Sequence, residues 1–417
     1  MKDYFLSIIL FAERHDRAII ALILVMVMFA GTVYSIHLGD RLRFADEIEY
    51  NLLANNLVKE HQFRLGWDEP TACRAPGLPF AMAPMVWFGA GIVHLRILNF
   101  LFFAISIFLT YRIVKRQSSR FSGVLAAVIV LCYPVLFYTA GTFYPETLAS
   151  TLFLMVVYLL LGSEISAWRF LVTGLIAGFL VLASPLFAPI LVILAIWYWI
   201  SKKPRKLIGP LLFGLGIFLV VGAWTVRNYS VFDSFVFIST RSGYTLRIGN
   251  NADTTPSSCA NDIAYMQEAT ELAKTMSEPQ IDKYFKAKAV EYILNNKAQS
   301  AKMYFLKFLN YFNYRNELST KSESSTLRDL IMLFTYGPLL LLLIIRLILS
   351  KRYNLLSMEK LFVLLYVSHA MLTAVFLTRI RYRVSFDFLI IIIVAIFINS
   401  VLRDWLQRNS HRLNTAQ

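Results

Sequence analysis

The chain is organised as a series of apolar runs separated by polar or basic turns. A helix that crosses the hydrocarbon core of a membrane needs about 20 mostly apolar residues. By this criterion the sequence predicts about ten membrane-spanning helices, within a range of about nine to eleven because two short runs meet at Pro185. The runs are Ala18–Leu38, Val93–Val114, Phe121–Tyr138, Thr147–Leu161, Phe170–Ala183, Leu186–Ile200, Ile208–Val226, Leu327–Leu349, Met358–Leu377 and Val384–Val401. The predicted fold class is therefore an α-helical polytopic membrane protein.

The composition agrees with this fold class and excludes several others. Of the 417 residues, 57% are hydrophobic and only 16% are charged, whereas a soluble domain carries about a quarter charged residues. Three cysteines are too few for a secreted disulfide scaffold, and the apolar content excludes a disordered chain. The net charge of +15 is explained more simply by a membrane surface than by nucleic acid, so membrane lipids are the expected partners.

The distribution of Lys and Arg predicts how the chain is oriented. Short cytoplasmic loops carry an excess of Lys and Arg. This rule places both termini in the cytoplasm, and it places the long segments 39–92 and 227–326 on the outer side of the membrane. Residues 47–60 and 281–315 in these segments are amphipathic, which favours helices lying in the membrane interface over a soluble cap. We expect all 417 residues to form a single domain, in which residues 327–402 contain the C-terminal spans and their basic outer turn.

One short outer turn violates the charge rule. Residues 378–383 carry Arg379, Arg381 and Arg383, whereas the outer turn of residues 139–146 carries no Lys or Arg. The planar guanidinium group binds phosphate through a rigid fork of donors. Binding of lipid headgroups would not require positive charge on this side, so the turn predicts a phosphate site. The side chains either point the same way in extended backbone or fan out around a helix end.

Acidic residues at the outer ends of the spans are the candidate catalytic groups. Asp46 and Glu47 follow the first span, and Glu146 lies at the mouth of the fourth. Asp46 with Glu49 also fits a helix capping box, which on spacing alone is the favoured interpretation but leaves Glu47 unexplained. Tyr50 is four residues after Asp46 and shares its helix face. Glu146 could simply face water.

Two further arginines lie in segments 39–92 and 227–326. Arg74 is the only cation in the proline-rich stretch 70–79, whose rigid, irregular backbone is typical of a site wall. The alternative is a plain turn in which Arg74 reaches toward headgroups. Arg227 follows Trp224 by three residues, and an interface anchor is the default interpretation of such a pair.

Several motifs occur in a fixed order along the chain. They are the acidic pair 46–47, E-Y-x-x-L-A-x-x-L (49–57), R-A-P-G-L-P (74–79), R-x-L-N (96–99), Y-P-E (144–146), W-T-V-R-N-Y (224–229), G-Y-T-L-R-I-G-N-N (243–251) and R-Y-R (381–383). In this order and spacing they resemble bacterial relatives of the dolichyl-phosphate-mannose protein mannosyltransferases and of the lipid A aminoarabinose transferase. These families share the glycosyltransferase C fold. The resemblance runs from about Phe44 to Ile398.

The resemblance implies a polyprenyl-phosphate-linked sugar donor, used on the periplasmic face. It implies catalytic roles for Asp46, its neighbour Glu47 and Glu146, and a place for Tyr50 and Tyr382 in the acceptor or sugar pocket. Donor-phosphate roles are expected for the basic residues, which are Arg74, Arg227, Arg379, Arg381 and Arg383. A divalent metal, Mg or Mn, bound by Asp46 and Glu146 is left open. Whether Cys73 and Cys259 are bridged is also left open.

The expected function is an integral-membrane glycosyltransferase that moves a hexosyl or pentosyl group by inverting single displacement, with Asp46 as general base. The chain lacks the large C-terminal region of the two named relatives, so a glycolipid or surface polysaccharide is a more fitting acceptor than a protein. A non-catalytic lipid-linked-sugar translocase would need charges deep within the spans. The acidic pair after the first span argues against a polysaccharide polymerase or ligase. The acids and arginines argue against an inactive scaffold.

Overall fold

The computed structural model describes residues 2–66, 69–162, 166–202, 208–315 and 325–414. The regular structure in these residues is helical, with an isolated β-bridge between Thr254 and Cys259. The all-helical fold class predicted from the sequence is confirmed.

Five helices of the described residues are long and apolar enough to cross a membrane. They are α2 (Asp16–Leu38), α5 (Ile92–Gln117), α11 (Ile208–Phe232), α16 (Thr326–Ile348) and α18 (Ile380–Asn414). A sixth span results if α6 (Arg120–Leu131) and α7 (Pro134–Ala140) are counted together, although they are bent by 64°. Pro134 is the first residue of α7, and proline cannot donate the hydrogen bond that would continue α6.

The other four predicted spans are also helices, but they do not meet the same criterion of length and hydropathy. They are α8 (Pro145–Leu160), α9 (Ala167–Ala183), α10 (Phe187–Lys202) and α17 (Ser357–Ala374). Ser184 and Pro185 separate α9 from α10, and Glu359 and Lys360 lower the hydropathy of α17. The chain is therefore a multi-pass helical membrane protein, and the count of ten spans stays a prediction.

The remaining helices belong mainly to the two long segments. They are α1 (Lys2–Arg14), α3 (Ala45–Lys59), α4 (Gly77–Trp87), α12 (Ser242–Gly249), α13 (Asp262–Leu272), α14 (Glu278–Asn295), α15 (Lys297–Tyr311) and the 3₁₀ helix η2 (Leu349–Lys351). The amphipathic stretches predicted at 47–60 and 281–315 therefore correspond to α3 and to the pair α14–α15.

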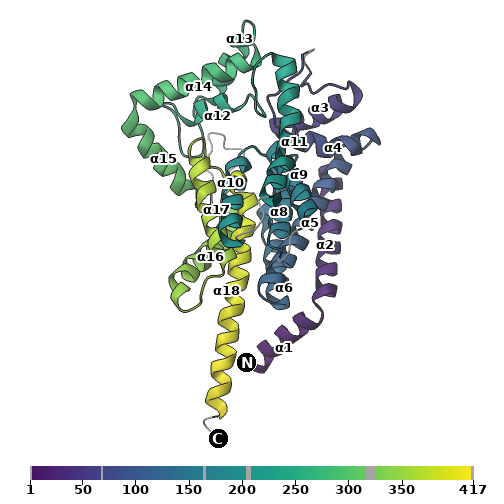
Figure 1. Ribbon diagram of the computed structural model, residues 1–417, viewed down its shortest axis with the longest axis vertical. Coiled ribbons are helices and arrows are strands. Elements are labelled where there is room, and N and C mark those ends of the chain that lie inside the picture. The colour runs from purple at the N-terminus through teal and green to yellow at the C-terminus, as the bar shows by residue number, and fades with distance from the viewer. Residues whose placement is uncertain (1, 67–68, 163–165, 203–207, 316–324, 415–417) are drawn as a thin grey trace.

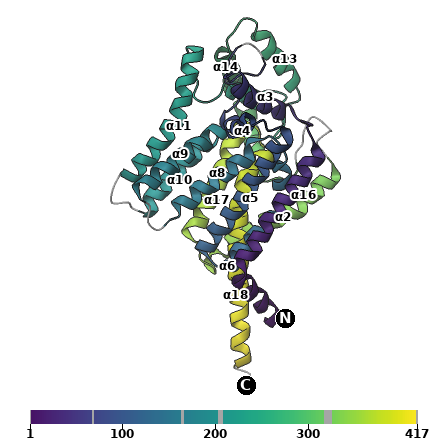
Figure 2. The same cartoon turned by 90° about the vertical axis from the view of Figure 1, so that its right-hand side faces the viewer.

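The two long segments lie together at one end of the molecule (Figure 1). Helices α3, α12, α13 and α14 are found there, and we call it the loop end. The two chain termini lie at the opposite end, the terminus end, as the rotated view in Figure 2 also shows. That both segments share the periplasmic side of a membrane stays a prediction.

Helix α18 is the centre of the bundle. In its apolar window 83% of the residues are buried, compared with 28% in α2, α11 and α16, which leave most of their apolar surface to lipid. The buried stretch runs from Arg383 to Phe397. Helix α18 runs from the middle of the bundle to the terminus end (Figure 1), and Arg381 in its first turn contacts Asp46, which follows the first span.

Candidate active site

The start of α3 is fixed by Glu47. Its Oε2 accepts hydrogen bonds from the backbone N–H groups of Arg43 (2.7 Å) and Phe44 (3.2 Å). Its Oε1 accepts one from the N–H of Phe143 (3.2 Å), and the side chain is fully buried. The first turn of a helix leaves backbone donors unsatisfied, and Glu47 satisfies such donors here. The capping role assigned to Asp46 and Glu49 was therefore wrong, and Glu47 holds α3 in place instead of facing a substrate.

Asp46 lies between two guanidinium groups. Its Oδ1 accepts from Nη2 of Arg74 (2.7 Å), and its Oδ2 accepts from Nη1 of Arg381 (2.7 Å). Asp46 and Arg381 are 335 positions apart in the sequence. Arg74 also forms an ion pair through Nε with Glu49, one turn further along α3. We call Asp46, Glu49, Arg74 and Arg381 the carboxylate–arginine cluster.

Aromatic rings support both arginines. The guanidinium of Arg74 lies 5.7 Å from the ring centroid of Tyr50. The guanidinium of Arg381 lies 5.0 Å from the rings of both Tyr144 and Tyr382, and its Nη2 donates to the Tyr382 hydroxyl (3.3 Å). Such cation–π contacts favour one orientation of the guanidinium plane. Tyr50 and Tyr382 thus lie in the site, where they contact the arginines.

The two arginines keep Asp46 ionised. Burial alone would raise the pKa of Asp46, but the charges of Arg381 and Arg74 outweigh burial and hold that pKa well below its ordinary value. The charge of Arg241 acts in the same direction. The side chain of Asp46 is still 20% exposed, so the cluster is open to solvent or to a ligand.

Glu146 is close to the cluster but has a different environment. It lies in the first turn of α8, before the apolar part of that helix. Its Oε2 is buried and has no hydrogen-bond partner within the described residues. Burial raises the pKa of Glu146 to about 7, although the charge of Arg381 lowers it. Its backbone carbonyl accepts from Oγ of Ser385 (3.1 Å), which ties the start of α8 to the start of α18.

The loop that carries Arg74 is held by contacts on both sides. Glu278 of α14 accepts hydrogen bonds from Oγ1 of Thr71 (2.9 Å) and from the N–H of Ala72 (3.1 Å). Gly77 packs so closely on the backbone of Ala183 that a Cβ atom would overlap it. These contacts explain why the proline-rich stretch presents Arg74 at a defined place.

Arg227 also anchors this loop and does not reach the cluster. Its Nη1 donates to the carbonyl of Thr71 (2.9 Å), and its guanidinium lies 4.8 Å from the ring of Trp224. The predicted role as a phosphate ligand is not supported by this position. The default interpretation, an arginine paired with Trp224, describes the observed contact.

Of the three arginines in the outer turn, only Arg381 faces Asp46. Arg383 is buried, forms an ion pair with Asp387 (3.0 Å) and lies 3.5 Å from the ring of Tyr336. Arg379 donates through Nε to the carbonyl of Ser257 (2.8 Å). Because α18 begins at Ile380, residues two positions apart point about 200° away from each other. The side chains fan out around a helix end. The buried ion pair of Arg383 contradicts its predicted role as a phosphate ligand, whereas the contact of Arg379 with Ser257 gives no support to such a role, which stays a prediction.

Three residues of the site were not identified from the sequence as site residues. Glu49 was considered only as a capping partner, and Tyr144 was noted only within the Y-P-E motif. Arg241 directly precedes α12, and no motif in the neighbouring sequence marks it as a site residue. Its charge acts on Asp46 only because the fold brings the two residues together.

The donor set does not fit a divalent metal. Within the described residues no three or more His, Cys, Asp or Glu side chains are grouped to hold an ion. Both oxygens of Asp46 already accept from guanidinium groups, which occupy the place that a cation bound to them would take. We therefore assign no step to a metal bound by Asp46 and Glu146.

The two cysteines of the long segments are not bridged. Cys73 and Cys259 are free thiols, and burial raises the pKa of Cys73 to about 11. Nδ2 of Asn251 donates to the sulfur of Cys259 (3.4 Å). Neither thiol contacts the carboxylate–arginine cluster through a hydrogen bond in the described part of the chain.

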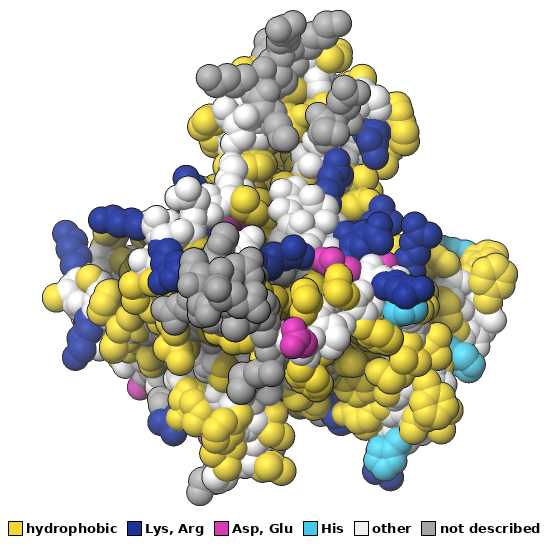
Figure 3. Space-filling view, turned by 90° about the horizontal axis from the view of Figure 1, so that it is seen from below, with side chains coloured by type: hydrophobic (Ala, Val, Ile, Leu, Met, Phe, Trp, Pro, Cys, Tyr) yellow, Lys and Arg dark blue, Asp and Glu magenta, His cyan; other side chains and the backbone are white. Residues whose placement is uncertain are grey.

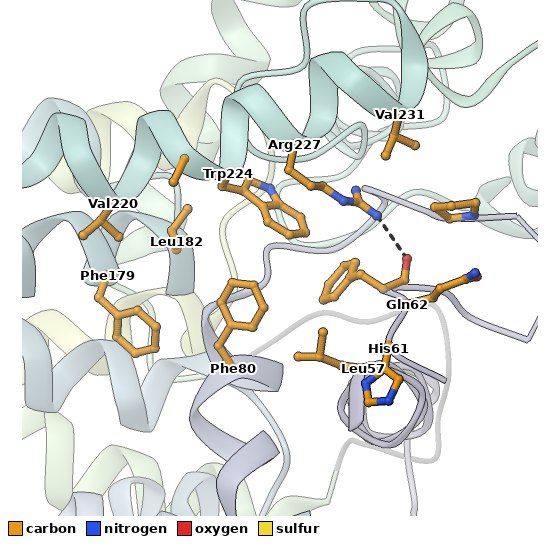
Figure 4. Close-up of a pocket in the computed structure, with 13 residues that line it drawn as sticks. Leu57, His61, Gln62, Phe80, Phe179, Leu182, Val220, Trp224, Arg227 and Val231 are labelled. Atoms are coloured by element: carbon orange, nitrogen blue, oxygen red, sulfur yellow. Dashed lines mark hydrogen bonds between the residues drawn. The ribbon is translucent and has the colours of Figure 1, made fainter. Parts of the chain in front are cut away.

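An apolar cavity of about 670 Å³ lies between α3, α4, α9 and α11 (Figure 4). Its walls include Leu57, Phe80, Phe179 and Trp224, and Arg227 is at one side. The loop of Arg74 borders it, because Pro70 also lines the cavity.

Comparison with known proteins finds similar solved structures only at low sequence identity. No protein-family model and no curated protein matches the chain. The chain is similar to the crystal structure of ArnT from Cupriavidus metallidurans bound to undecaprenyl phosphate, with 10% identity, a TM-score of 0.45, and coverage of 93% of this chain and 77% of that one. For the apo state of ArnT the identity is 12%, the TM-score 0.41, and the coverage 90% and 76%. Likeness at this level does not assign the chain to a family.

Proposed function

We propose that the protein is an integral-membrane glycosyltransferase that moves a sugar from a polyprenyl-phosphate donor to a glycolipid or surface-polysaccharide acceptor. The observation that carries the proposal is the carboxylate–arginine cluster at the loop end, where Asp46 holds Arg74 and Arg381 in a partly exposed position. The motif order gives the donor class, because it resembles enzymes that use polyprenyl-phosphate sugars. The inner membrane and a periplasmic active site belong to the same proposal.

The arginines would bind the donor phosphate. A guanidinium paired with a carboxylate presents the same fork of donors that a phosphate requires, so a phosphate can replace Asp46 and Glu49 as the partner. The lipid phosphate leaves the anomeric carbon with an increase of negative charge on its oxygen. Arg74 and Arg381, prealigned by the rings of Tyr50 and Tyr144, would stabilise that charge.

The acceptor hydroxyl must lose a proton as its oxygen attacks the anomeric carbon. The bond to the phosphate oxygen breaks, and direct attack inverts the configuration. An effective base has a pKa near the working pH, and Glu146, at about 7, fits this better than Asp46. We therefore propose Glu146 as the base, whereas the sequence pointed to Asp46. Asp46 would keep the arginines in place before the donor arrives.

The apolar cavity beside the loop gives the donor a place for part of its hydrocarbon chain. Pro70 lines the cavity and Arg74 lies four residues further on in the same loop. A lipid-linked donor needs an apolar surface adjoining a phosphate site, and the 70–79 loop connects the two.

The proposal is tested by mass spectrometry of envelope glycolipids and polysaccharides from a deletion strain. The strain is complemented with the unaltered chain, Asp46→Asn, Glu146→Gln or the control Arg379→Gln, at matched expression. We expect one sugar to be lost in the deletion, and restored by the unaltered chain and the control but not by the two acid variants. Restoration by both acid variants would overturn the assignment of the site.

A lipid-linked-sugar translocase is the second candidate. Such a protein would need charges among its spans, and the ion pair Arg383–Asp387 in the first two turns of α18 is buried. A translocase would act normally in the two acid variants. The same strains therefore distinguish the two functions.

A further inference from the structure

A second cavity lies toward the terminus end, opposite the loop end that carries the carboxylate–arginine cluster (Figure 1). It has a volume of about 690 Å³ and is bordered by α2, α5 and α8. Four cations line it, Arg17 from α2 and Arg112, Lys115 and Arg116 from α5. Nothing in the proposed transfer reaction uses these residues. We call this cavity the basic groove.

The groove is amphipathic along its length. Arg17, Ala21 and Leu24 follow one another at spacings of four and three, and Phe108 and Arg112 at a spacing of four, so each set lies on one helix face. With a rise of 1.5 Å per residue, Leu24 lies about 10 Å deeper in the span than Arg17. The basic residues are therefore at the surface and the apolar residues lie within the membrane. Phe108 is 38% exposed and faces outward from the bundle.

Three of the four cations have no acidic partner in the described part of the chain. Lys115 forms an ion pair with Asp16 (2.5 Å), which also accepts from the hydroxyl of Tyr111 (2.6 Å). Arg112 donates to the hydroxyl of Tyr158 (2.8 Å), a neutral group. Arg17 and Arg116 are exposed and form no ion pair with another described residue. The groove therefore keeps three guanidinium groups available to an anion.

We propose that the basic groove binds one anionic phospholipid. Its phosphate would lie on the guanidinium groups of Arg17, Arg112 and Arg116, and an acyl chain would follow Ala21, Leu24 and Phe108. Phosphate fits the guanidinium fork, and the apolar wall requires a ligand that continues into the membrane. Lys and Arg side chains border hydrophobic surface across this end of the molecule (Figure 3), as expected for contact with acidic headgroups.

The proposal is tested by native mass spectrometry of the purified full-length protein in detergent, titrated with phosphatidylglycerol. We expect one molecule to be retained. The double variant Arg17→Gln with Arg116→Gln should weaken its retention by at least about tenfold, because two charge-assisted contacts are lost. The matched control is Lys351→Gln with Lys360→Gln. This control removes the same amount of positive charge from a region outside the basic groove, where Arg352 next to η2 pairs with Asp404 of α18. It should leave retention of the lipid unchanged.

Two further arms identify the ligand. Phosphatidylcholine should be retained less than phosphatidylglycerol, and inorganic phosphate should not displace the lipid. Ala21→Trp places a large side chain in the apolar part of the groove without changing the charge, and it should also reduce retention of the lipid. This variant provides the test if the double arginine variant does not fold. Equal retention in all variants, or displacement by millimolar phosphate, would overturn the proposal. No readout depends on glycosyl transfer, so failure here is distinct from failure of the proposed enzyme.

Discussion

Arg381 and Arg383 are two positions apart in α18, and each forms an ion pair with an aspartate, yet the two pairs differ in almost every other respect. The side chains of Arg381 and Asp46 are 29% and 20% exposed, whereas those of Arg383 and Asp387 are 1% exposed each. The first pair connects distant parts of the chain, and the second is formed within one turn of helix. An exposed pair can exchange its partner for a ligand. A buried pair is held by its surroundings and serves the fold.

The surroundings of Arg383 show why it is fixed. Its Nη1 donates to the carbonyls of Tyr311 (2.9 Å) and Asn313 (2.7 Å), and Asp387 also accepts from the hydroxyl of Tyr133 (2.7 Å). Arg381 instead donates to the side chains of Asp46 and Tyr382 and lies over the rings of Tyr144 and Tyr382, with no backbone carbonyl among these partners. Site chemistry therefore belongs to Arg381, although the motif contains both.

Removal of Arg383 is expected to have the largest effect. Arg383→Ala would leave Asp387 buried and uncompensated, which costs about 3–5 kcal/mol of unfolding free energy. Thermal unfolding in detergent measures the loss. The matched control, Arg381→Ala, should change stability by less than about 1 kcal/mol, because that pair is partly exposed. Equal destabilisation by the two variants would erase the distinction between the pairs.

Glu146→Gln is expected to lower the rate of transfer by about 10²–10⁴-fold, the usual contribution of a positioned base. Glu146 acts as a base only when ionised, so the activity of the unaltered protein should rise with pH through about 7. The variant should lose this rise. A pH–rate profile of both proteins in proteoliposomes measures it, and a rise that persists in the variant would assign the base elsewhere.

Asp46→Asn is expected to lower turnover by at least about 100-fold, because two charge-assisted hydrogen bonds that align the arginines are lost. Folding should be intact, which thermal unfolding can confirm. Since Asp46 is already ionised well below neutral pH, the residual activity should keep the dependence on pH near 7. A variant that retains most of its turnover would contradict the role of the cluster.

Arg381→Lys keeps the positive charge but loses the planar pair of N–H donors that a guanidinium offers to phosphate. It should weaken binding of the donor by about tenfold. The effect should appear in the concentration of donor needed for half-maximal rate, measured with proteoliposomes of graded donor content. A change in maximal rate alone would place Arg381 outside the donor site.

Arg379→Gln should have the smallest effect. Its side chain donates a hydrogen bond to the carbonyl of Ser257 and does not contact Asp46, so turnover should change by less than about threefold and stability by less than about 0.5 kcal/mol. A large loss of turnover would return Arg379 to the phosphate site. The three arginines of one turn would then act together, contrary to the structure.

The sequence by itself determined the class of the molecule. Apolar runs predicted the five long spanning helices of the described residues and four shorter or less apolar ones, since helices satisfy their own backbone hydrogen bonds in a membrane, but they missed the apolar helix α4 and the break between α6 and α7. It also offered Asp46, Glu146, Arg74 and Arg381 as candidate site residues, but it offered Glu47, Arg227, Arg379 and Arg383 on equal terms.

Only the tertiary structure decided which of the flagged residues meet. The role of Glu47 depends on where α3 begins, because a shift of one position changes which side chain caps the helix. The separation of Arg381 from Arg383 depends on helical rather than extended backbone at 380. Packing of the two long segments carries no periodic signal in the sequence. It places Arg227 of α11 against the 70–79 loop and brings the charge of Arg241 near Asp46.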